Sequence, residues 1–219
     1  MSKNGQLPLP LTYPSQYQQS DFINAPCYQE VVQWLNLYPN WYHHALLILG
    51  PASCGKTHLT RIFTKHIYRA KDLTFEDIMY MPELSAVEDI DEVGVDETTL
   101  FHLYNFTAEK NKKVLLTARA MPFWKLPDLK SRMAIVPVAK VGLPDDKTIM
   151  LLILKEITER QLDIESDVID YVLKHIERSF EYVLSFVRTV QMLSLAQKRK
   201  ITIPLAKEAL NLISEEKLL

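Results

Sequence analysis

The chain has 219 residues, which is enough for one large domain or for a medium domain followed by a small one. Hydrophobic residues make up 47% of the sequence, so a packed core can form, and the formal net charge is −2 at pH 7. A charge so close to zero excludes the strongly basic surface of a dedicated nucleic-acid binder.

The cysteine content argues against a disulfide-rich secreted protein, and the longest apolar run argues against a membrane-spanning one. Cys27 and Cys54 cannot supply the disulfide framework of a small secreted protein, and they suit the reducing cytosol. Residues 1–5 lack the apolar core of a signal peptide, and the apolar run from Ile149 to Leu154 is far too short to cross a bilayer. We therefore expect a cytoplasmic protein with no membrane association.

Residues 1–21 are rich in glutamine and proline and have little to bury, which predicts a flexible tail. Within this tail, a glutamine is followed by alternating leucines and prolines in the run Gln6-Leu7-Pro8-Leu9-Pro10-Leu11. Such a run could dock in extended form into an apolar pocket of a partner, with the glutamine amide fixing the register. A proline-rich tail without a binding role has the same composition, so the residues alone leave both interpretations open.

The region up to residue 143 alternates between helical and strand patterns. We expect, in chain order, a helix over 28–37, a buried strand over 45–49, a helix over 58–68, short strands over 75–81 and 84–88, a helix capped by Asp96, a buried strand over 113–117, a short helix over 127–133 and a final strand over 134–138. This alternation predicts an α/β domain over residues 22–143, in which helices cover both faces of a parallel sheet.

Strand patterns stop after Gly142, and the spacing of apolar residues then predicts four helices. The start signals of these helices are, in order, Pro144-Asp145-Asp146, Ser166, Ser179, and Thr202 with Pro204. A small all-α domain over residues 144–219 is therefore expected to follow the α/β domain.

The segment between the first strand and the helix after it matches the phosphate-binding pattern G-x-x-x-x-G-K-[ST] at every required position. This phosphate loop consists of Gly50, Pro51, Ala52, Ser53, Cys54, Gly55, Lys56 and Thr57. The glycines let the backbone curl around an anion, toward which the N–H groups of the loop and of the helix start would point. Lys56 would bring a positive charge to the terminal phosphates, and Thr57 a hydroxyl ligand for Mg²⁺. The pattern predicts a site for ATP or ADP, and the alternative is a chance match in a strand-to-helix loop.

Two acids and a threonine stand at the ends of predicted strands. Glu88 and Asp89 end one strand, and a strand-end carboxylate beside a phosphate loop holds Mg²⁺ or polarises the attacking water. Glu88 is one methylene longer than the usual Asp, and the many acids around it favour a solvated loop as the alternative. Thr117 ends the next strand and could turn its hydroxyl toward the γ-phosphate, although a strand-terminal threonine is as often a cap.

The short helix over 127–133 carries Arg132 near its end. A guanidinium there could reach across a subunit boundary and stabilise charge on a neighbour's ATP. An ordinary surface arginine has the same local pattern, and spacing alone favours that simpler interpretation.

Taken together, these segments resemble the AAA+ ATPase core of DnaA-type bacterial replication initiators, and most of all the Hda family of short DnaA homologues that inactivate the initiator. The resemblance covers nearly the whole chain. It rests on residues 6–11 at the family's sliding-clamp-binding peptide, 50–57 at Walker A, 87–91 at Walker B, 101–105 in the next helix, 116–119 at sensor 1, 126–132 in the arginine-finger block and 199–204 at the start of the last helix. The Walker A loop is generic, whereas its combination with the tail peptide and L-P-D-L-x-S-R is much more specific.

The resemblance implies an AAA+ P-loop NTPase fold, with a parallel sheet flanked by helices and a helical lid, and ADP or ATP with Mg²⁺ as cofactors. It implies that Gln6, Leu7, Leu9 and Leu11 bind the clamp and that Arg132 acts in trans on the ATP of DnaA. The function implied is inactivation of the initiator by stimulated ATP hydrolysis, in a complex with the DNA-loaded sliding clamp. DNA would be contacted only through these partners, and a homo-oligomer is compatible with the same interface.

Three positions depart from the initiator pattern. Arg119 stands where initiators carry Asp, Glu88 stands in Walker B, and the sensor 2 arginine falls on Glu181. Arg178 lies three residues earlier on nearly the same helix face and could substitute for that arginine. These departures favour weak or absent intrinsic ATPase activity with nucleotide binding retained. The initiators' helix-turn-helix domain has no counterpart after the lid, so we do not expect direct reading of DNA sequence.

Three rival functions remain open at this level. They are an initiator or helicase loader that binds DNA directly, a small-molecule phosphotransferase built on the same loop, and a catalytically silent scaffold that uses its nucleotide only for folding. The phosphotransferase would need a substrate pocket with paired arginines, which the sequence does not indicate.

Overall fold

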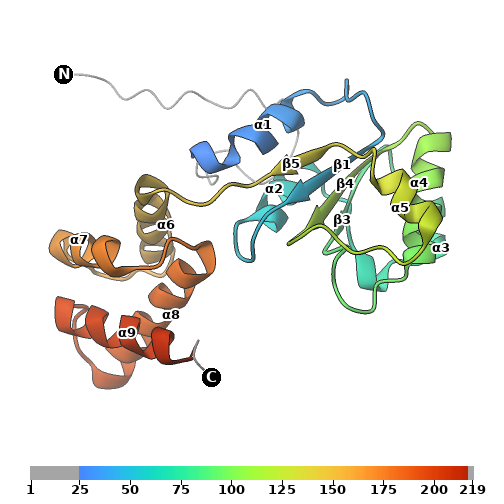
Figure 1. The fold of residues 1–219 in the computed structure, drawn as a ribbon. Helices are drawn as coiled ribbons and strands as arrows, with labels where there is room; N and C mark the ends of the chain where they lie inside the picture. The colour runs from blue at the N-terminus through green and yellow to red at the C-terminus, as the bar shows by residue number, and fades with distance from the viewer. Residues whose placement is uncertain (1–24, 217–219) are drawn as a thin grey trace, which may run out of the picture. The chain divides into compact units, whose positions relative to one another are not determined.

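The computed structural model describes residues 25–216, in which a parallel α/β sheet is followed by a set of packed helices (Figure 1). The chain divides into two compact units. The first includes Tyr28–Pro51 and Gly55–Val141, and the second includes Ala52–Cys54 and the chain from Gly142 onward.

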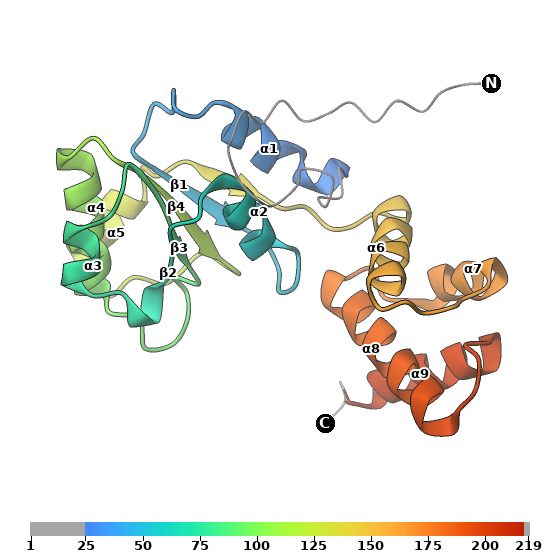
Figure 2. The same ribbon diagram turned by 180° about the vertical axis from the view of Figure 1, so that it is seen from behind.

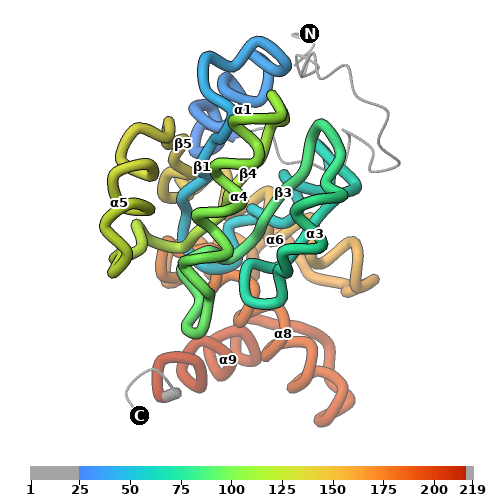
Figure 3. Tube along the Cα trace, turned by 90° about the vertical axis from the view of Figure 1, so that its right-hand side faces the viewer, coloured from blue at the N-terminus to red at the C-terminus, as the bar shows by residue number. Residues whose placement is uncertain are grey.

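The first unit is built on a five-stranded sheet with the order β2-β3-β4-β1-β5, in which every neighbouring pair is parallel. Its strands are β1 (Ala45–Leu49), β2 (Ile67–Arg69), β3 (Leu84–Glu88), β4 (Lys113–Ala118) and β5 (Val138–Lys140). The labels of β5, β1, β4 and β3 follow one another across Figure 3 in this order. Leu49 is level with Ala118 in the register, so the carboxyl ends of the two central strands lie at one edge of the sheet.

Helices cover both faces of this sheet, as the continuous apolar runs of β1 and β4 require. They are η2 (Pro26–Tyr28), α1 (Gln29–Asn36), α2 (Lys56–Phe63), η3 (Ala70–Asp72), α3 (Phe75–Met79), α4 (Glu97–Glu109) and α5 (Pro127–Met133). In Figures 1 and 2, α2 is drawn on one side of the strands and α3, α4 and α5 are drawn on the other. The main core fills the space under α3, α4 and α5, where Leu47 and Leu116 meet Leu103 and Leu129.

The prediction of a strand over 75–81 was wrong, because this segment forms helix α3. Thr74 accepts a hydrogen bond from the Asp77 N–H at 3.1 Å, and the Asp77 carboxylate accepts one from the Thr74 N–H at 3.0 Å. This reciprocal pair is a capping box, which satisfies donors at the start of a helix. The local cap outweighs the strand preference that the apolar residues suggest.

Two further boundaries differ from the prediction. Helix α2 ends at Phe63, and the segment expected to extend it to Tyr68 instead contains the edge strand β2, which pairs with β3. The last strand is β5 over Val138–Lys140, because residues 134–137 follow the end of α5 and only then does the chain pair with β1. Both segments are three-residue edge strands, too short for a clear alternation of side chains.

The second unit contains four helices of the described chain: α6 (Asp146–Glu159), α7 (Ser166–His175), α8 (Phe180–Gln197) and α9 (Ile203–Glu216). Their apolar faces form a separate core in which Ile153, Val172, Phe186 and Leu205 are almost completely buried. Asp145 and Ser179 cap α6 and α8 through side-chain hydrogen bonds. The predicted helical domain is thus a packed bundle with its own core.

Candidate functional site

The phosphate loop (residues 50–57) leaves the carboxyl end of β1 and ends in the first turn of α2. The Gly50 N–H donates to the Ala118 carbonyl at 3.2 Å, which continues the β1–β4 contact into the loop. Ser53 (φ 61°) and Gly55 (φ 84°) take left-handed backbone conformations, which turn the chain before the helix begins. Gly55 is the N-cap of α2 and has no side chain with which to cap it. The helix start can therefore turn its N–H groups toward an anion.

The Lys56 ammonium group is buried within the loop that precedes it. The residue is only 8% exposed, and its Nζ donates to the Gly50 carbonyl at 2.8 Å and to the Pro51 carbonyl at 3.0 Å. Neutral carbonyls are weaker partners for an ammonium group than phosphate oxygens are. This position of the charge fits a loop that exchanges its own carbonyls for the phosphates of a nucleotide.

Glu88, the last residue of β3, extends its carboxylate to helix α2. The residue is 6% exposed; its Oε2 accepts a hydrogen bond from the Thr57 hydroxyl at 3.2 Å, and its Oε1 accepts one from the Thr60 hydroxyl at 2.5 Å. A buried carboxylate is costly without such partners, and the two hydroxyls offset part of that cost. Thr57 and Glu88, both predicted to act on Mg²⁺, therefore lie in direct contact.

Thr60 was missed by the sequence analysis, although a signal was present. It lies three residues after Thr57, so both hydroxyls share one face of α2. Its immediate neighbours on the buried side are Leu59, Ile62 and Phe63, among which a fully buried threonine is the exception. A polar residue at an inward position of the helix after a phosphate loop needs a partner, and here that partner is Glu88.

Asp89 and Thr117 are joined by their own hydrogen bond. The Asp89 N–H donates to the Thr117 hydroxyl oxygen at 3.1 Å, and Asp89 takes a left-handed conformation with φ 57°. The structure therefore uses Thr117 to hold the backbone at the end of β3, as in the capping alternative. Asp89 lines an open pocket of about 540 Å³ together with Lys71, Asp91, Glu92, Val93 and Arg119.

Arg132 is exposed on α5, and its guanidinium lies over two aromatic rings of α4. The distance from its Cζ is 5.5 Å to the centroid of Phe101 and 5.6 Å to that of Tyr104, which is within the range of cation–π attraction. The Tyr104 ring in turn meets the His44 ring edge-on at 4.3 Å. Because His44 immediately precedes β1, this aromatic cluster stands beside the amino end of the strand that carries the phosphate loop at its other end.

Arg132 and the phosphate loop therefore lie at opposite ends of β1. The strand has five residues, each advancing the chain by about 3.3 Å. A side chain at the amino end of this sheet cannot bridge the strand to serve the loop of its own chain.

His44 stays uncharged near neutral pH. Burial, reinforced by the neighbouring His43 and by the positive charges of Lys113 and Arg132, lowers its pKa to about 4. The pKa of His43 is also lowered, chiefly by burial, while its Nε2 lies 3.2 Å from the Tyr104 hydroxyl. The histidine pair therefore supports Tyr104 as a neutral stack and adds no positive charge beside Arg132.

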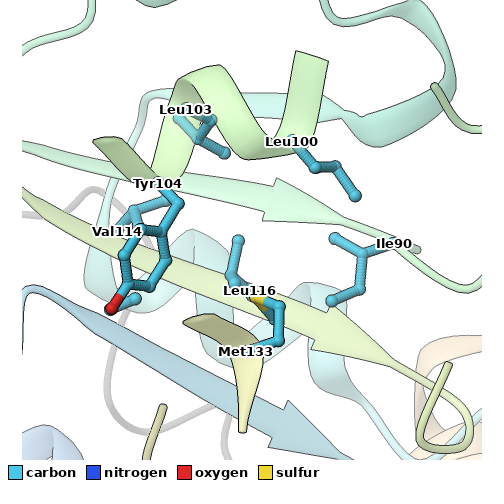
Figure 4. A pocket seen from close by; sticks show the side chains of 8 residues that line it. Ile90, Leu100, Leu103, Tyr104, Val114, Leu116 and Met133 are labelled. Atoms are coloured by element: carbon cyan, nitrogen blue, oxygen red, sulfur yellow. The ribbon is translucent and has the colours of Figure 1, made fainter. Parts of the chain in front are cut away.

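The gap under α4 is a packing feature of the core (Figure 4). It measures about 10 Å³, roughly the room that one water molecule needs, and is bounded by apolar side chains such as Leu100, Leu116 and Met133. The Tyr104 ring closes one side, with its hydroxyl directed away from Ile90. A gap of this size and character cannot hold a nucleotide.

Comparisons with known proteins find similarity to Hda and DnaA. Residues 145–210 match the family model described as "Hda, lid domain". A curated relative, the chromosomal replication initiator protein DnaA of Buchnera aphidicola subsp. Cinara cedri, is 24% identical over 250 residues, which cover 98% of this chain and 57% of the relative. The lid region is thus similar to that of Hda proteins, and the chain as a whole is related to DnaA.

A second curated relative is the DnaA protein of Limosilactobacillus fermentum, 24% identical over 78% of this chain and 46% of that protein. The chain thus spans about half the length of the curated relatives it matches. Among solved structures, domain III of Thermotoga maritima DnaA superposes with a TM-score of 0.71 at 17% identity, covering 89% of this chain and 95% of that one. A DnaA bound to AMPPCP and single-stranded DNA matches with a TM-score of 0.62 at 17% identity, covering 83% of this chain and 66% of that one. These similarities establish the AAA+ fold.

Arg178 does not share a helix face with Glu181 as predicted, because it lies between α7 and α8, before the Ser179 cap. In the lid it is paired with Asp146. Its Nε lies 2.8 Å from Asp146 Oδ1 and its Nη2 lies 3.2 Å from Oδ2, with both side chains more than half exposed. The guanidinium holds the pKa of the Asp146 carboxyl below its usual range. Arg178 would have to exchange this partner for a phosphate to act as the predicted sensor.

Two features of the described chain bear on its surroundings. Gln6, Leu7, Leu9 and Leu11, the predicted clamp-binding residues, lie outside the described residues. Among residues 25–216, none of the helices combines the length and apolar character that crossing a bilayer requires.

Proposed function

We propose that this chain binds ADP or ATP with Mg²⁺ in its phosphate loop and that it stimulates hydrolysis of the ATP bound to a neighbouring DnaA. The nucleotide part is supported by the left-handed turn at Gly55, the buried Lys56 ammonium group and the contact between Thr57 and Glu88. Two solved DnaA structures of the same fold contain the ATP analogue AMPPCP.

The residues present fit the cofactor. Backbone N–H groups of residues 50–57 and Lys56 would hold the phosphates, while Thr57 and Glu88 would hold Mg²⁺. The metal, when bound, would neutralise charge between the terminal phosphates. Glu88 and Asp89 are also the acids that could polarise water. The Thr57 hydroxyl donates to Glu88, whereas Asp89 lines the open pocket, so we propose Glu88 as the acid that acts on the metal together with Thr57.

The position of Arg132 is the main support for the proposed stimulation of ATP hydrolysis on a neighbouring DnaA. It lies at the amino end of β1, whereas the phosphate loop lies at the carboxyl end, so its guanidinium is available only to another molecule. The aromatic rings beneath it orient the charge and leave the residue exposed. A guanidinium supplied in trans to a phosphoryl group in transfer accelerates the reaction by about 10³- to 10⁵-fold.

DnaA is the proposed partner because the lid matches the Hda lid family and the whole chain is related to DnaA. In the same proposal, Gln6, Leu7, Leu9 and Leu11 tether the chain to the DNA-loaded sliding clamp. A tether raises the local concentration of one partner beside the other without any new contact between them. DNA would then be contacted through the clamp and DnaA.

The test is the rate at which DnaA hydrolyses its ATP, measured with this chain, the clamp and DNA. Arg132→Ala should keep ADP binding and clamp binding and should lose the stimulation. Lys130→Ala removes an exposed cation from the same helix and should retain it. Full stimulation by Arg132→Ala would show that Arg132 is not the stimulating residue. If this chain alone, without DnaA, hydrolyses ATP in a reaction that depends on Arg132, the partner would be a second copy of this chain and not DnaA.

The tether is tested separately. Replacing Gln6, Leu7 and Leu9 together with alanine should abolish capture by immobilised clamp and leave ADP affinity unchanged. If the variant is captured as well as the unaltered chain, the clamp binds another surface of this chain. Tight sequence-specific DNA binding by the chain alone would instead support a directly acting initiator.

A further inference from the structure

Helix α2 places a second hydroxyl on the Glu88 carboxylate, and neither the phosphate-loop pattern nor the family resemblance assigns it a role. Thr60 is 0% exposed, and its Oγ1 lies 2.5 Å from Glu88 Oε1. The same oxygen lies 3.0 Å from the Thr57 carbonyl one turn earlier in the helix. One hydroxyl proton cannot serve both acceptors fully, and the shorter distance, to a charged acceptor, is the stronger bond.

The two oxygens of Glu88 are therefore held differently. Oε1 is fixed by Thr60 in the buried interior of the first unit, whereas Oε2 faces the Thr57 hydroxyl at the longer distance of 3.2 Å. Thr57 is the threonine of the phosphate loop and carries the hydroxyl expected on Mg²⁺. The contact with Thr60 thus leaves one oxygen of Glu88 directed toward the expected metal position and takes the other away from it.

The length of the Glu88 side chain explains why such a device is needed. A glutamate has one more rotatable bond than the aspartate usual at this position, so its carboxylate has more orientations to lose on ordering. Thr60 removes that freedom because its own side chain is β-branched, fully buried and restricted at χ1. A short, charge-assisted bond to a stiff donor can hold a longer carboxylate in one orientation.

We propose that Thr60 is a positioning residue that orients Glu88 for Mg²⁺, and that it compensates for glutamate in place of aspartate. This inference rests on the nucleotide site proposed above. Thr60 itself does not touch the nucleotide or the metal. Residues that orient metal ligands in this way change metal affinity by about 10- to 100-fold when they are replaced.

The experiment is a Mg²⁺ titration of the ADP-loaded chain, followed by calorimetry or by a fluorescent ADP analogue. Thr60→Val keeps the volume and the branching and removes the hydroxyl. It should raise the Mg²⁺ concentration at the midpoint by about tenfold or more, and leave ADP affinity in EDTA within about twofold. Thr60→Ser restores the hydroxyl and should recover most of the original midpoint.

A matched control separates this role from simple loss of a buried hydroxyl. Thr107 is 1% exposed in α4, and its hydroxyl donates to carbonyls of its own helix. Thr107→Val should lower the melting temperature by an amount similar to Thr60→Val and leave the Mg²⁺ midpoint unchanged. A midpoint for Thr60→Val within twofold of the unaltered chain would overturn the proposal.

The pairing with Glu88 is tested by a double-mutant cycle. Glu88→Asp shortens the side chain and withdraws it from Thr60, so adding Thr60→Val to that background should change the Mg²⁺ midpoint no further. Equal effects of Thr60→Val in both backgrounds would contradict a role acting through Glu88. If the unaltered chain binds ADP equally well with Mg²⁺ and with EDTA, only the positioning role fails; if it does not bind ADP at all, the proposed nucleotide site fails first.

Discussion

The Arg132 guanidinium lies 5.5 Å from the centroid of the Phe101 ring, and this contact joins the short helix α5 to α4. The ring is partly buried against the main core, while the arginine is exposed. The packed Phe101 ring therefore holds the guanidinium in a position that a partner protein can reach. Such a contact at an exposed site contributes about 0.5–1 kcal/mol.

Phe101→Leu should therefore weaken the proposed action of Arg132 without abolishing it. Leucine retains the packing against the core and removes the π face. We expect stimulation of DnaA ATP hydrolysis to fall by about two- to fivefold, the equivalent of the lost cation–π contact. Phe106→Leu is the matched control, because Phe106 packs on the same core and contacts Lys112 instead. A loss larger in Phe106→Leu than in Phe101→Leu would argue against this role of the Phe101 ring.

Lys56→Ala should reduce ADP affinity by about tenfold or more, because it removes a charge-assisted contact with the phosphates. Isothermal titration calorimetry measures the change. Lys110→Ala is the control, since Lys110 is exposed after α4 and pairs only weakly with its neighbour Glu109. Unchanged ADP affinity in Lys56→Ala would refute the phosphate-loop assignment.

His44 should make stability depend on pH. Its pKa is lowered to about 4 in the folded chain, against about 6.5 when unfolded, so between these values the unfolded state binds more protons. The contribution of His44 to the free energy of unfolding is therefore fully present above pH 6.5 and is lost as the pH falls toward 4.

His44→Phe keeps an aromatic ring against Tyr104 and removes the titration. The fall in melting temperature between pH 6.5 and pH 4.5 should become shallower in this variant, with some slope left because the pKa of His43 is lowered as well. His175→Phe is the control, an exposed histidine stacked on Tyr171 in α7. An unchanged slope in His44→Phe would show that other groups carry the acid sensitivity.

Arg178→Ala tests the lid. If Arg178 exchanges Asp146 for a phosphate, its removal should weaken ADP binding several-fold, with the melting temperature of the apo chain unchanged because the pair is exposed and contributes little. Asp146→Asn releases the arginine from its carboxylate and should have the opposite effect on ADP affinity. Equal ADP affinity in both variants and the unaltered chain would remove Arg178 from the site.

Much of the fold could be predicted because local signals agree with the final structure. The apolar runs of β1 and β4, the Asp96 cap of α4 and the Ser179 cap of α8 are each set by neighbouring residues. Predictions failed where a short edge strand had no such local signal, as in β2 and β5, and where the Thr74–Asp77 capping box overrode an apolar pattern.

The sequence by itself determined the phosphate loop, because glycine, lysine and threonine at fixed spacing define a backbone turn and its charges within eight consecutive residues. It also determined the change from an α/β unit to a helical lid, since strand and helix periods differ. Only the tertiary structure decided that Thr60 meets Glu88, that Thr117 holds the Asp89 backbone, and that Arg132 stands at the far end of β1 from the loop. Those relationships join residues some 28 or more positions apart, and the sheet order and register that bring them together arise from packing of the whole core.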